Sequence, residues 1–509
     1  MKKIIYILVC LSFFSCESID FDDPSTLTNA EAIKKIKSLG YVLTTSSVQT
    51  TFTTTTSNAG GTHFSLYADQ STNTNGSQSW WDFANEPRLR LNNNSAYRGN
   101  AALTTLYSNF YQANLDATKV IDIIENQSVK IYDEAGNDRT IDCQIGAYYV
   151  KGVSQGYLGV IFDRGIIVDD TSIATRAFPN SYKELIANGI SHLDRALEIA
   201  GGVNDFKFDF LSGITISKSD FIKLANSIAA RILSSEPRDI KEAAALGASH
   251  WSKVLSYAQK GFTSDFLIVT VSGGYYNQLV DRLVYFYSGG AYLPVDVKLP
   301  YLVDNTGNSP TYYPTDDTIL PPVTTDDNRF YEYFDYTTNF GILMESRGRG
   351  LFSNYYRKRW AHPSNSLDVS GAINPYFLVE ELRLLRAESK FWLQDYAGAA
   401  AELNDPESSR KLKGGLSDVN PTEKALKDAL HYEYAIEIDG AGGTFVPFSF
   451  MRRNDLLIGG TPTEFPIPQL QLDLIGEDTY TFGGKEYAGE VGIYGEITTA
   501  RNNGWKLSE

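Results

Sequence analysis

The sequence predicts a mainly helical fold in which helical pairs pack beside a long segment without regular periodicity. Apolar side chains recur at steps of three and four residues in several windows, which is the spacing of one face of a helix. The stretch 385–403 places Ala387, Tyr396 and Ala400 as in a helix–turn–helix repeat of the tetratricopeptide type, where small residues let paired helices approach closely. Residues 262–375 are dominated by Pro, Gly, Tyr and Asp and show no long periodic run, so we expect loops there.

The individual elements follow from local patterns. The Thr/Ser tract 44–57 is expected to form loops or strands, because such side chains hydrogen-bond their own backbone and disfavour helix. Seven residues from Leu103 to Ile124 and seven from Leu378 to Ala399 lie at helical spacing. Further helices are expected at 143–162, 182–199, 219–234, 240–260 and 421–438, and a short strand at 266–271.

The first sixteen residues have the pattern of a secretory leader. Lys2 and Lys3 precede the apolar stretch 4–14, and Ser15-Cys16 follows. The stretch is too short to span a bilayer, which needs about 20 apolar residues. A cysteine directly after the cut is the lipoprotein arrangement, so we expect lipidation of Cys16, although a plain secretory leader with a chance cysteine is the alternative.

These patterns divide the chain into four parts. Residues 1–15 are the leader, and residues 16–29 are an acidic tether that follows the lipidated cysteine. Residues 30–261 form the N-terminal helical part of the fold, and residues 262–509 combine the loop-rich segment with a C-terminal helical repeat part. No later segment reaches 18 apolar residues, so we expect the lipid to be the only membrane attachment.

Charge and cysteine content exclude several classes of protein. The formal net charge is −16, and loss of Lys2 and Lys3 with the leader makes it −18, which argues against binding nucleic acid or an anionic membrane surface. With Cys10 in the leader and Cys16 as the anchor, Cys143 remains alone, so no internal disulfide is possible. We expect Cys143 to be a buried small hydrophobe.

Aromatic residues make up 13% of the chain, which suggests that some line a surface for flat, hydroxylated ligands, although core filling explains most of them.

Four features occur in an order that is typical of one protein family. They are the leader with its acidic tether, Leu106-Tyr107 with Ala113-Asn114 in an early helix, the stretch RAESKFWLQDYAGAAAELN, and the stretch MRRNDLLIGGTPTEFPIP. In these features the chain resembles the SusD/RagB family of outer-membrane, nutrient-binding lipoproteins. It departs from the family pattern at 438–443, at 469–476 and over the tail 477–509, which leaves the ligand open.

The resemblance implies a mainly α fold, with tetratricopeptide-like helical pairs packed against an irregular, loop-rich ligand-binding half with few short strands. It implies a lipoprotein on the outer face of the outer membrane that binds an oligosaccharide or polysaccharide, or peptides in one branch of the family. The ligand would pass to a SusC-like TonB-dependent transporter. No catalysis and no cofactor are implied.

The first candidate binding region is the polar stretch 69–85. Sugar rings stack their C–H faces on aromatic planes, and carboxylates, amides and guanidinium groups bind their hydroxyls. This stretch offers Asp69, Trp80, Trp81 and Asn85, of which the family resemblance favours Trp81 and Asn85. The alternative is that the two tryptophans anchor a loop on the scaffold.

The second candidate region is 275–360, which is rich in tyrosine. Its expected ligand contacts are Tyr285, Tyr287, Arg357 and Trp360, although some aromatic residues there must belong to the core. The same region also holds Tyr275, Tyr276, Tyr292, Asp335, Arg347, Tyr355 and Tyr356.

Two patterns could indicate a hydrolase, but both are better explained by structural roles. Residues 152–156 read Gly-Val-Ser-Gln-Gly, the nucleophile-elbow pattern around Ser154, but they lie inside an expected helix, where glycines permit close packing. Glu380 and Glu381, with Glu402, could be imagined as a glycosidase acid pair, but they are expected on the solvated face of a helix.

Metal chemistry is not expected. The five histidines form no His-Glu-x-x-His motif, and no Cys–His zinc spacing occurs. The acidic stretches 133–138 and 326–328 could ligate Ca²⁺, but they lack the EF-hand spacing and are better interpreted as surface turns.

Overall fold

The computed structural model describes most of the chain after the acidic tether. The described residues are 29–56, 61–73, 79–170, 177–211, 213–269, 293–312, 318–338, 344, 351–360, 371, 373–442 and 445–506. The leader, the proposed anchor Cys16 and the tether up to residue 28 lie outside them.

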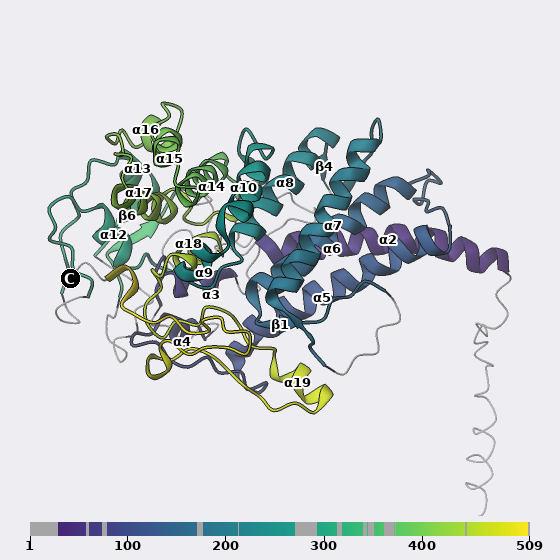
Figure 1. Ribbon diagram of the computed structural model, residues 1–509, viewed down its shortest axis with the longest axis horizontal. Helices are drawn as coiled ribbons and strands as arrows, with labels where there is room; N and C mark the ends of the chain where they lie inside the picture. The colour runs from purple at the N-terminus through teal and green to yellow at the C-terminus, as the bar shows by residue number, and fades with distance from the viewer. Residues whose placement is uncertain are drawn as a thin grey trace, which may run out of the picture.

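Helices that pack one against the next form an extended layer. It starts with α2 and runs through α5, α6, α7, α8 and α10 to α14, which contacts both α15 and α17. In Figure 1 this layer runs from α2 and α5 on the right to α15, α16 and α17 at the upper left. The bounds are α2 Asn29–Thr56, α5 Ala101–Ile121, α6 Thr140–Ile161, α7 Tyr182–Gly202, α8 Lys218–Ser234, α10 Gly247–Gln259, α14 Val379–Trp392, α15 Tyr396–Leu403, α16 Ser409–Leu412 and α17 Glu423–Ile436.

An irregular half with short elements covers one side of this layer. The stretch after α18, drawn in yellow, runs along the lower side of the molecule beside α4 and carries α19 (Figure 1). Isolated bridges join distant loops here, such as Phe162 with Phe465 and Arg90 with Gly483. The short helices are α3 Gly61–Tyr67, α4 Trp80–Ala84, α9 Ile240–Ala245, α12 Lys298–Val303, α13 Asn328–Tyr333, α18 Phe445–Arg453 and α19 Gln469–Ile475.

The described strands are short and pair in antiparallel twos. They are β1 Arg164–Gly165 with β2 Asn180–Ser181, β3 Phe208–Leu211 with β4 Ile214–Ile216, β5 Phe266–Val269 with β8 Ile373–Phe377, and β6 Phe334–Tyr336 with β7 Tyr355–Arg357. The predicted class, mainly helical with an irregular half and few short strands, is therefore confirmed.

Two expected helices are divided by residues with positive φ. The window 240–260 splits into α9 and α10 at Gly247, whose φ is +68°. The window 378–399 splits into α14 and α15 at Gln394, whose φ is +63°, and the side chain of Asp395 then caps α15 by accepting from the Gly398 N–H. The helix–turn–helix pair expected over 385–403 is thus present.

The Thr-rich tract was wrongly predicted as loop or strand, because residues 44–56 belong to helix α2. Its hydroxyls do bond their own backbone, but in the helical i to i−4 pattern. Thr44 donates to the Gly40 carbonyl at 2.9 Å, and Thr51 donates to the Ser47 carbonyl at 2.8 Å. Both threonines are fully buried, so tertiary packing outweighs their weak helix propensity.

Glycines let α6 and α7 cross at close range. A Cβ added at Gly189 would lie 2.5 Å from the backbone nitrogen of Gly156, and one at Gly152 would lie 2.9 Å from the Gly189 carbonyl oxygen. Ser154 lies between these glycines in α6 and is fully buried. The Gly-x-Ser-x-Gly pattern is therefore a packing motif, and Ser154 is not on a nucleophile elbow.

The α6–α7 crossing gives a test with a control in the same helix. Gly189→Ala is expected to lower the free energy of unfolding by about 1–3 kcal/mol, because the added methyl overlaps backbone atoms that cannot move independently. Gly201→Ala should not destabilise the protein, since no atom lies within 4 Å of its added Cβ. Chemical denaturation of both variants checks this, and equal midpoints would contradict the close crossing.

Carboxylates of α14 lie in the interior, which corrects the expectation of a solvated face. Glu381 has no exposed surface and pairs in bidentate fashion with Arg231 of α8, at 2.6 and 2.7 Å. Glu388 pairs with Arg453 of α18 in the same way, at 2.6 and 2.8 Å. Glu380 is also buried, and burial raises its pKa to about 7. α14 is therefore a central helix that is held on two sides.

The Arg231–Glu381 pair is expected to behave as a buried pair and not as a surface one. Glu381→Leu should lower the free energy of unfolding by about 3–5 kcal/mol, because it leaves the Arg231 charge buried without a counter-charge. Arg231→Met combined with Glu381→Leu should lose much less. Denaturation of the single and double variants measures the difference, and a double variant as unstable as the single one would contradict the assignment.

Candidate functional site

The segment that carries the two adjacent tryptophans forms the short helix α4. Trp80 and Phe83 are buried, and α4 packs on α3. The Phe83 ring lies 4.3 Å from the His63 ring and 5.2 Å from the Tyr67 ring, centroid to centroid. Trp81 and Asn85 are half-buried at the ends of the helix. The buried aromatic side of α4 thus fixes where its polar side faces.

A cavity of about 330 Å³ opens beside α4, and we call it the α4 pocket. Its volume is at the lower end of the range for small-molecule sites, about 300–1,000 Å³. It combines an aromatic and aliphatic wall with a carboxylate, a guanidinium, an amide and a phenol. The lining residues are Tyr67, Asp82, Phe83, Leu89, Arg90, Leu91, Asn92 and Tyr97.

The polar side chains of the α4 pocket are held by neighbours. The Tyr97 hydroxyl donates to the Asp82 carboxylate, and burial together with this bond raises the pKa of Tyr97, so its phenol remains a donor. Arg90 pairs with Glu490 at 3.1 Å and donates to the Thr481 carbonyl at 2.7 Å, while its guanidinium lies 3.7 Å above the Tyr487 ring. The pocket therefore presents acceptors and donors in fixed positions.

Three predicted ligand contacts belong to the interior instead. Asp69 and Trp80 have no exposed surface. Arg357 is 4% exposed and pairs with Asp439 at 2.6 Å, while it donates to the Leu293 carbonyl at 3.0 Å. In this structure the three side chains are buried among partners of the chain itself, which is how a loop anchor would lie, and their contact with a ligand stays a prediction.

Of the five remaining predicted contacts, three lie in the described part of the chain and two lie outside it. Trp81 and Asn85 flank the residues that line the α4 pocket, without lining it themselves. Trp360 packs against the main hydrophobic core, with the Arg359 guanidinium 4.6 Å from its ring, and does not line the pocket. Tyr285 and Tyr287 lie outside the described residues, so their contact with a ligand remains a prediction.

Sequence reasoning missed most of the pocket lining. Asp82 and Phe83 fall within the predicted region 69–85, but Leu89 to Asn92 and Tyr97 follow it. The alternation Arg-Leu-Arg-Leu-Asn over 88–92 could have pointed to them, because such a segment presents opposite chemistry to its two sides.

Another cavity lies at the end of the helical repeats, and we call it the α17 cavity. It measures about 380 Å³, and Tyr432 is the single aromatic residue among its lining. An apolar floor is surrounded by aspartates and amides. The lining residues are Val303, Asn305, Thr325, Asp326, Arg410, Leu416, Asp418, Val419, Asn420, Ala425, Asp428, Ala429 and Tyr432.

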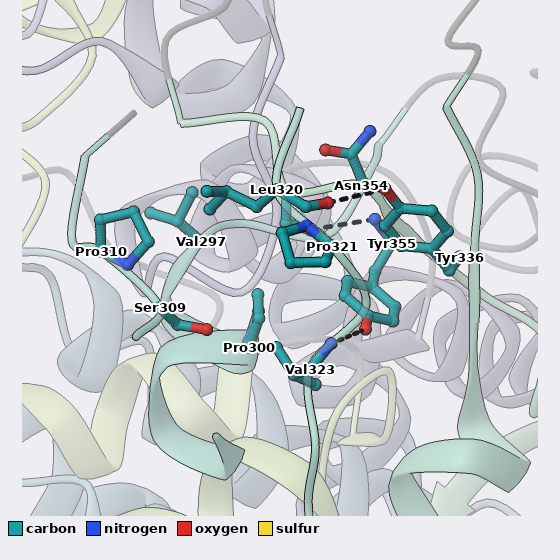
Figure 2. A pocket seen from close by; sticks show the side chains of 11 residues that line it. Val297, Pro300, Ser309, Pro310, Leu320, Pro321, Val323, Tyr336, Asn354 and Tyr355 are labelled. Atoms are coloured by element: carbon teal, nitrogen blue, oxygen red, sulfur yellow. Dashed lines mark hydrogen bonds between the residues drawn. The ribbon is translucent and has the colours of Figure 1, made fainter. Parts of the chain in front are cut away.

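A narrow cavity beneath the proline-rich loops is too small for a sugar (Figure 2). Its volume is about 20 Å³, which is room for about one water molecule. Tyr336 donates to the Leu320 carbonyl at 2.7 Å, and the Tyr355 hydroxyl accepts from the Val323 N–H at 2.8 Å, as Figure 2 shows. These tyrosines of the second candidate region tie loops together.

The described ranges contain neither a metal-binding cluster nor a membrane-spanning helix. There, no group of three His, Cys, Asp or Glu side chains is arranged to hold a metal ion. Asp327 instead caps α13 and pairs with the buried Arg329 at 2.8 Å. No helix in the described part of the chain is long and apolar enough to cross a membrane. The Cys143 thiol is buried as expected, and burial raises its pKa to about 12.

Solved structures of the SusD superfamily share this fold. A SusD superfamily protein from Parabacteroides distasonis aligns with a TM-score of 0.58 at 11% identity over 95% of this chain and 97% of its own. One from Bacteroides vulgatus aligns with a TM-score of 0.54 at 12% identity over 85% and 96%. A SusD-like carbohydrate binding protein from the same species aligns with a TM-score of 0.52 at 14% identity over 84% and 86%.

No protein-family model and no curated protein matches the chain. The chain has a SusD-like fold, and at identities this low the likeness is one of fold. The resemblance inferred from the four sequence features is confirmed at that level.

Proposed function

We propose that this protein is a cell-surface lipoprotein that binds an oligosaccharide or polysaccharide and delivers it to a SusC-like TonB-dependent transporter. The observation that carries the binding role is the α4 pocket, where an aromatic wall faces fixed polar groups. The SusD-like fold supports it, because one protein of that fold is named as carbohydrate binding.

The chemistry of the α4 pocket suits a sugar ring. Leu89, which is 45% exposed, offers apolar surface for C–H faces, with the nearly buried rings of Tyr67 and Phe83 behind it. Asp82 can accept hydrogen bonds from hydroxyls, and the Asn92 amide is exposed and can both donate and accept. Trp81 and Asn85 lie within two residues of Asp82 and Phe83 in the sequence, and they would contact a second sugar ring of the glycan.

Anchoring and delivery rest on the sequence. Lipidation of Cys16 and the tether would place the globule on the outer face of the outer membrane, and the order of the family motifs supports the transporter as partner. We propose no catalytic step, since Ser154 of the Gly-x-Ser-x-Gly pattern lies inside α6 with no exposed surface.

Affinity gels test the binding role. The mature chain from Glu17 would be run through gels containing starch, fructan, β-glucan, xylan, mannan, pectin or chitin derivatives. One polymer is expected to retard the protein, and Asn92→Ala and Trp81→Ala should each weaken that retardation by about fivefold or more, the equivalent of one lost hydrogen bond or stacking contact.

The α17 cavity supplies the control. Asn420→Ala removes the same side chain from another exposed cavity and should leave retardation unchanged. Retardation lost only in Asn420→Ala would contradict the α4 pocket as the site. Absence of retardation by every polymer, with peptides recovered from the native protein, would favour the peptide-binding branch over glycan binding.

A further inference from the structure

The turn Gly504–Lys506 reaches the segment that carries the α4 pocket. Trp505 is 5% exposed, and its indole N–H donates to a carboxylate oxygen of Asp69 at 2.8 Å. Lys506 pairs with Glu86 at 2.8 Å, and its ammonium lies 3.5 Å from the centre of the Tyr312 ring. This tail had no family counterpart in the sequence, yet Trp505 contacts Asp69 in the predicted binding region 69–85, and Lys506 contacts Glu86, the residue that follows that region.

The Asp69 carboxylate links Trp505 to Arg88. One oxygen of the Asp69 carboxylate accepts from Trp505, and the other pairs with the Arg88 guanidinium. The side chains of Asp69 and Arg88 are almost completely buried. A buried cation needs a counter-charge held in place, so the orientation of Asp69 decides where the guanidinium lies.

Arg88 in turn holds the backbone of the α4 pocket. Its guanidinium donates to the Phe83 carbonyl at 3.1 Å and, through longer bonds, to the Leu66 and Tyr67 carbonyls at 3.4 and 3.5 Å. Phe83 and Tyr67 form the aromatic wall of the pocket. The guanidinium therefore ties the end of α3 to α4 from behind that wall.

Negative charge is dense around this connection. Burial, with the carboxylates of Asp69 and Glu86, raises the pKa of Asp296 well above its usual range. Lys506 brings a cation to this acidic group, as does Lys298, whose ammonium donates to the Ala68 carbonyl. Loss of Lys506 would leave the Glu86 carboxylate, which is 2% exposed, without its ammonium partner.

We propose that Trp505 and Lys506 are positioning residues that fix the α4 pocket through Asp69, Arg88 and Glu86. The proposal rests on the proposed function for what the pocket binds, but the coupling between the turn and α4 does not depend on any ligand. A purely structural tail would stabilise the whole protein without a particular effect on α4.

Hydrogen–deuterium exchange of the mature chain tests the coupling without a ligand. Trp505→Phe keeps a ring against Tyr301, whose ring centroid lies 5.4 Å from that of Trp505, and removes the indole donor. Exchange at residues 80–85 should become at least about tenfold faster, as expected when a hydrogen bond to a charged group is lost. Exchange in α6 should stay unchanged.

A matched variant separates positioning from general loss of stability. Trp251→Phe removes another buried indole donor, which reaches from α10 to the Ala243 carbonyl of α9 at 2.9 Å. It should not change exchange at residues 80–85. Lys506→Met, which keeps the aliphatic stem, should accelerate exchange there, whereas Lys424→Met, which breaks an exposed pair with Asp428, should not.

The outcomes are distinct. Unchanged exchange at 80–85 in Trp505→Phe and Lys506→Met, or equal acceleration in Trp251→Phe, overturns the positioning role. If a polysaccharide retards the wild type, weaker retardation in Trp505→Phe but not in Trp251→Phe supports it further. If no polysaccharide retards the wild type, the glycan proposal fails while the exchange result still decides the coupling.

Discussion

Buried arginine–carboxylate pairs join different elements of this chain, 19 to 150 residues apart in sequence. Arg231 meets Glu381, Arg453 meets Glu388, and Arg88 meets Asp69, each with almost no exposed surface. Removing two charges from water is costly, and only good geometry with further hydrogen bonds offsets that cost. The Arg453–Glu388 pair joins the irregular half to the helical layer, because α18 belongs to the first and α14 to the second.

The candidate site depends on the same principle. The α4 pocket lies in the irregular half, where short helices and loops provide little regular hydrogen bonding. Its aromatic wall is held by the Arg88 guanidinium, which donates to main-chain carbonyls of both α3 and α4. A loop-borne site can keep a fixed shape when its backbone is tied to buried charges instead of to a sheet.

Periodicity predicted α5 well because its buried apolar residues recur at steps of three and four along one face. The helix expected around Leu103–Ile124 corresponds to α5, and the repeat pair at 385–403 corresponds to α14 and α15. The prediction for the Thr-rich tract was wrong because its hydroxyls donate to backbone carbonyls within the buried helix α2. The solvated position predicted for Glu381 was also wrong. Its counter-ion Arg231 is 150 residues away in the sequence, so the local pattern cannot reveal the pair.

The sequence by itself determined the helical class, the repeat pair and the isolated cysteine, because these depend on composition and on local spacing. Only the tertiary structure decided that Trp80 and Asp69 face inward while Asp82 and Asn92 line an open pocket. The direction of a side chain on a five-residue helix depends on what packs against it. Here those partners come from α3 and from Arg88, which donates to the Phe83 carbonyl five residues before it, and Arg88 is held by Asp69, which Trp505 contacts from the far end of the chain.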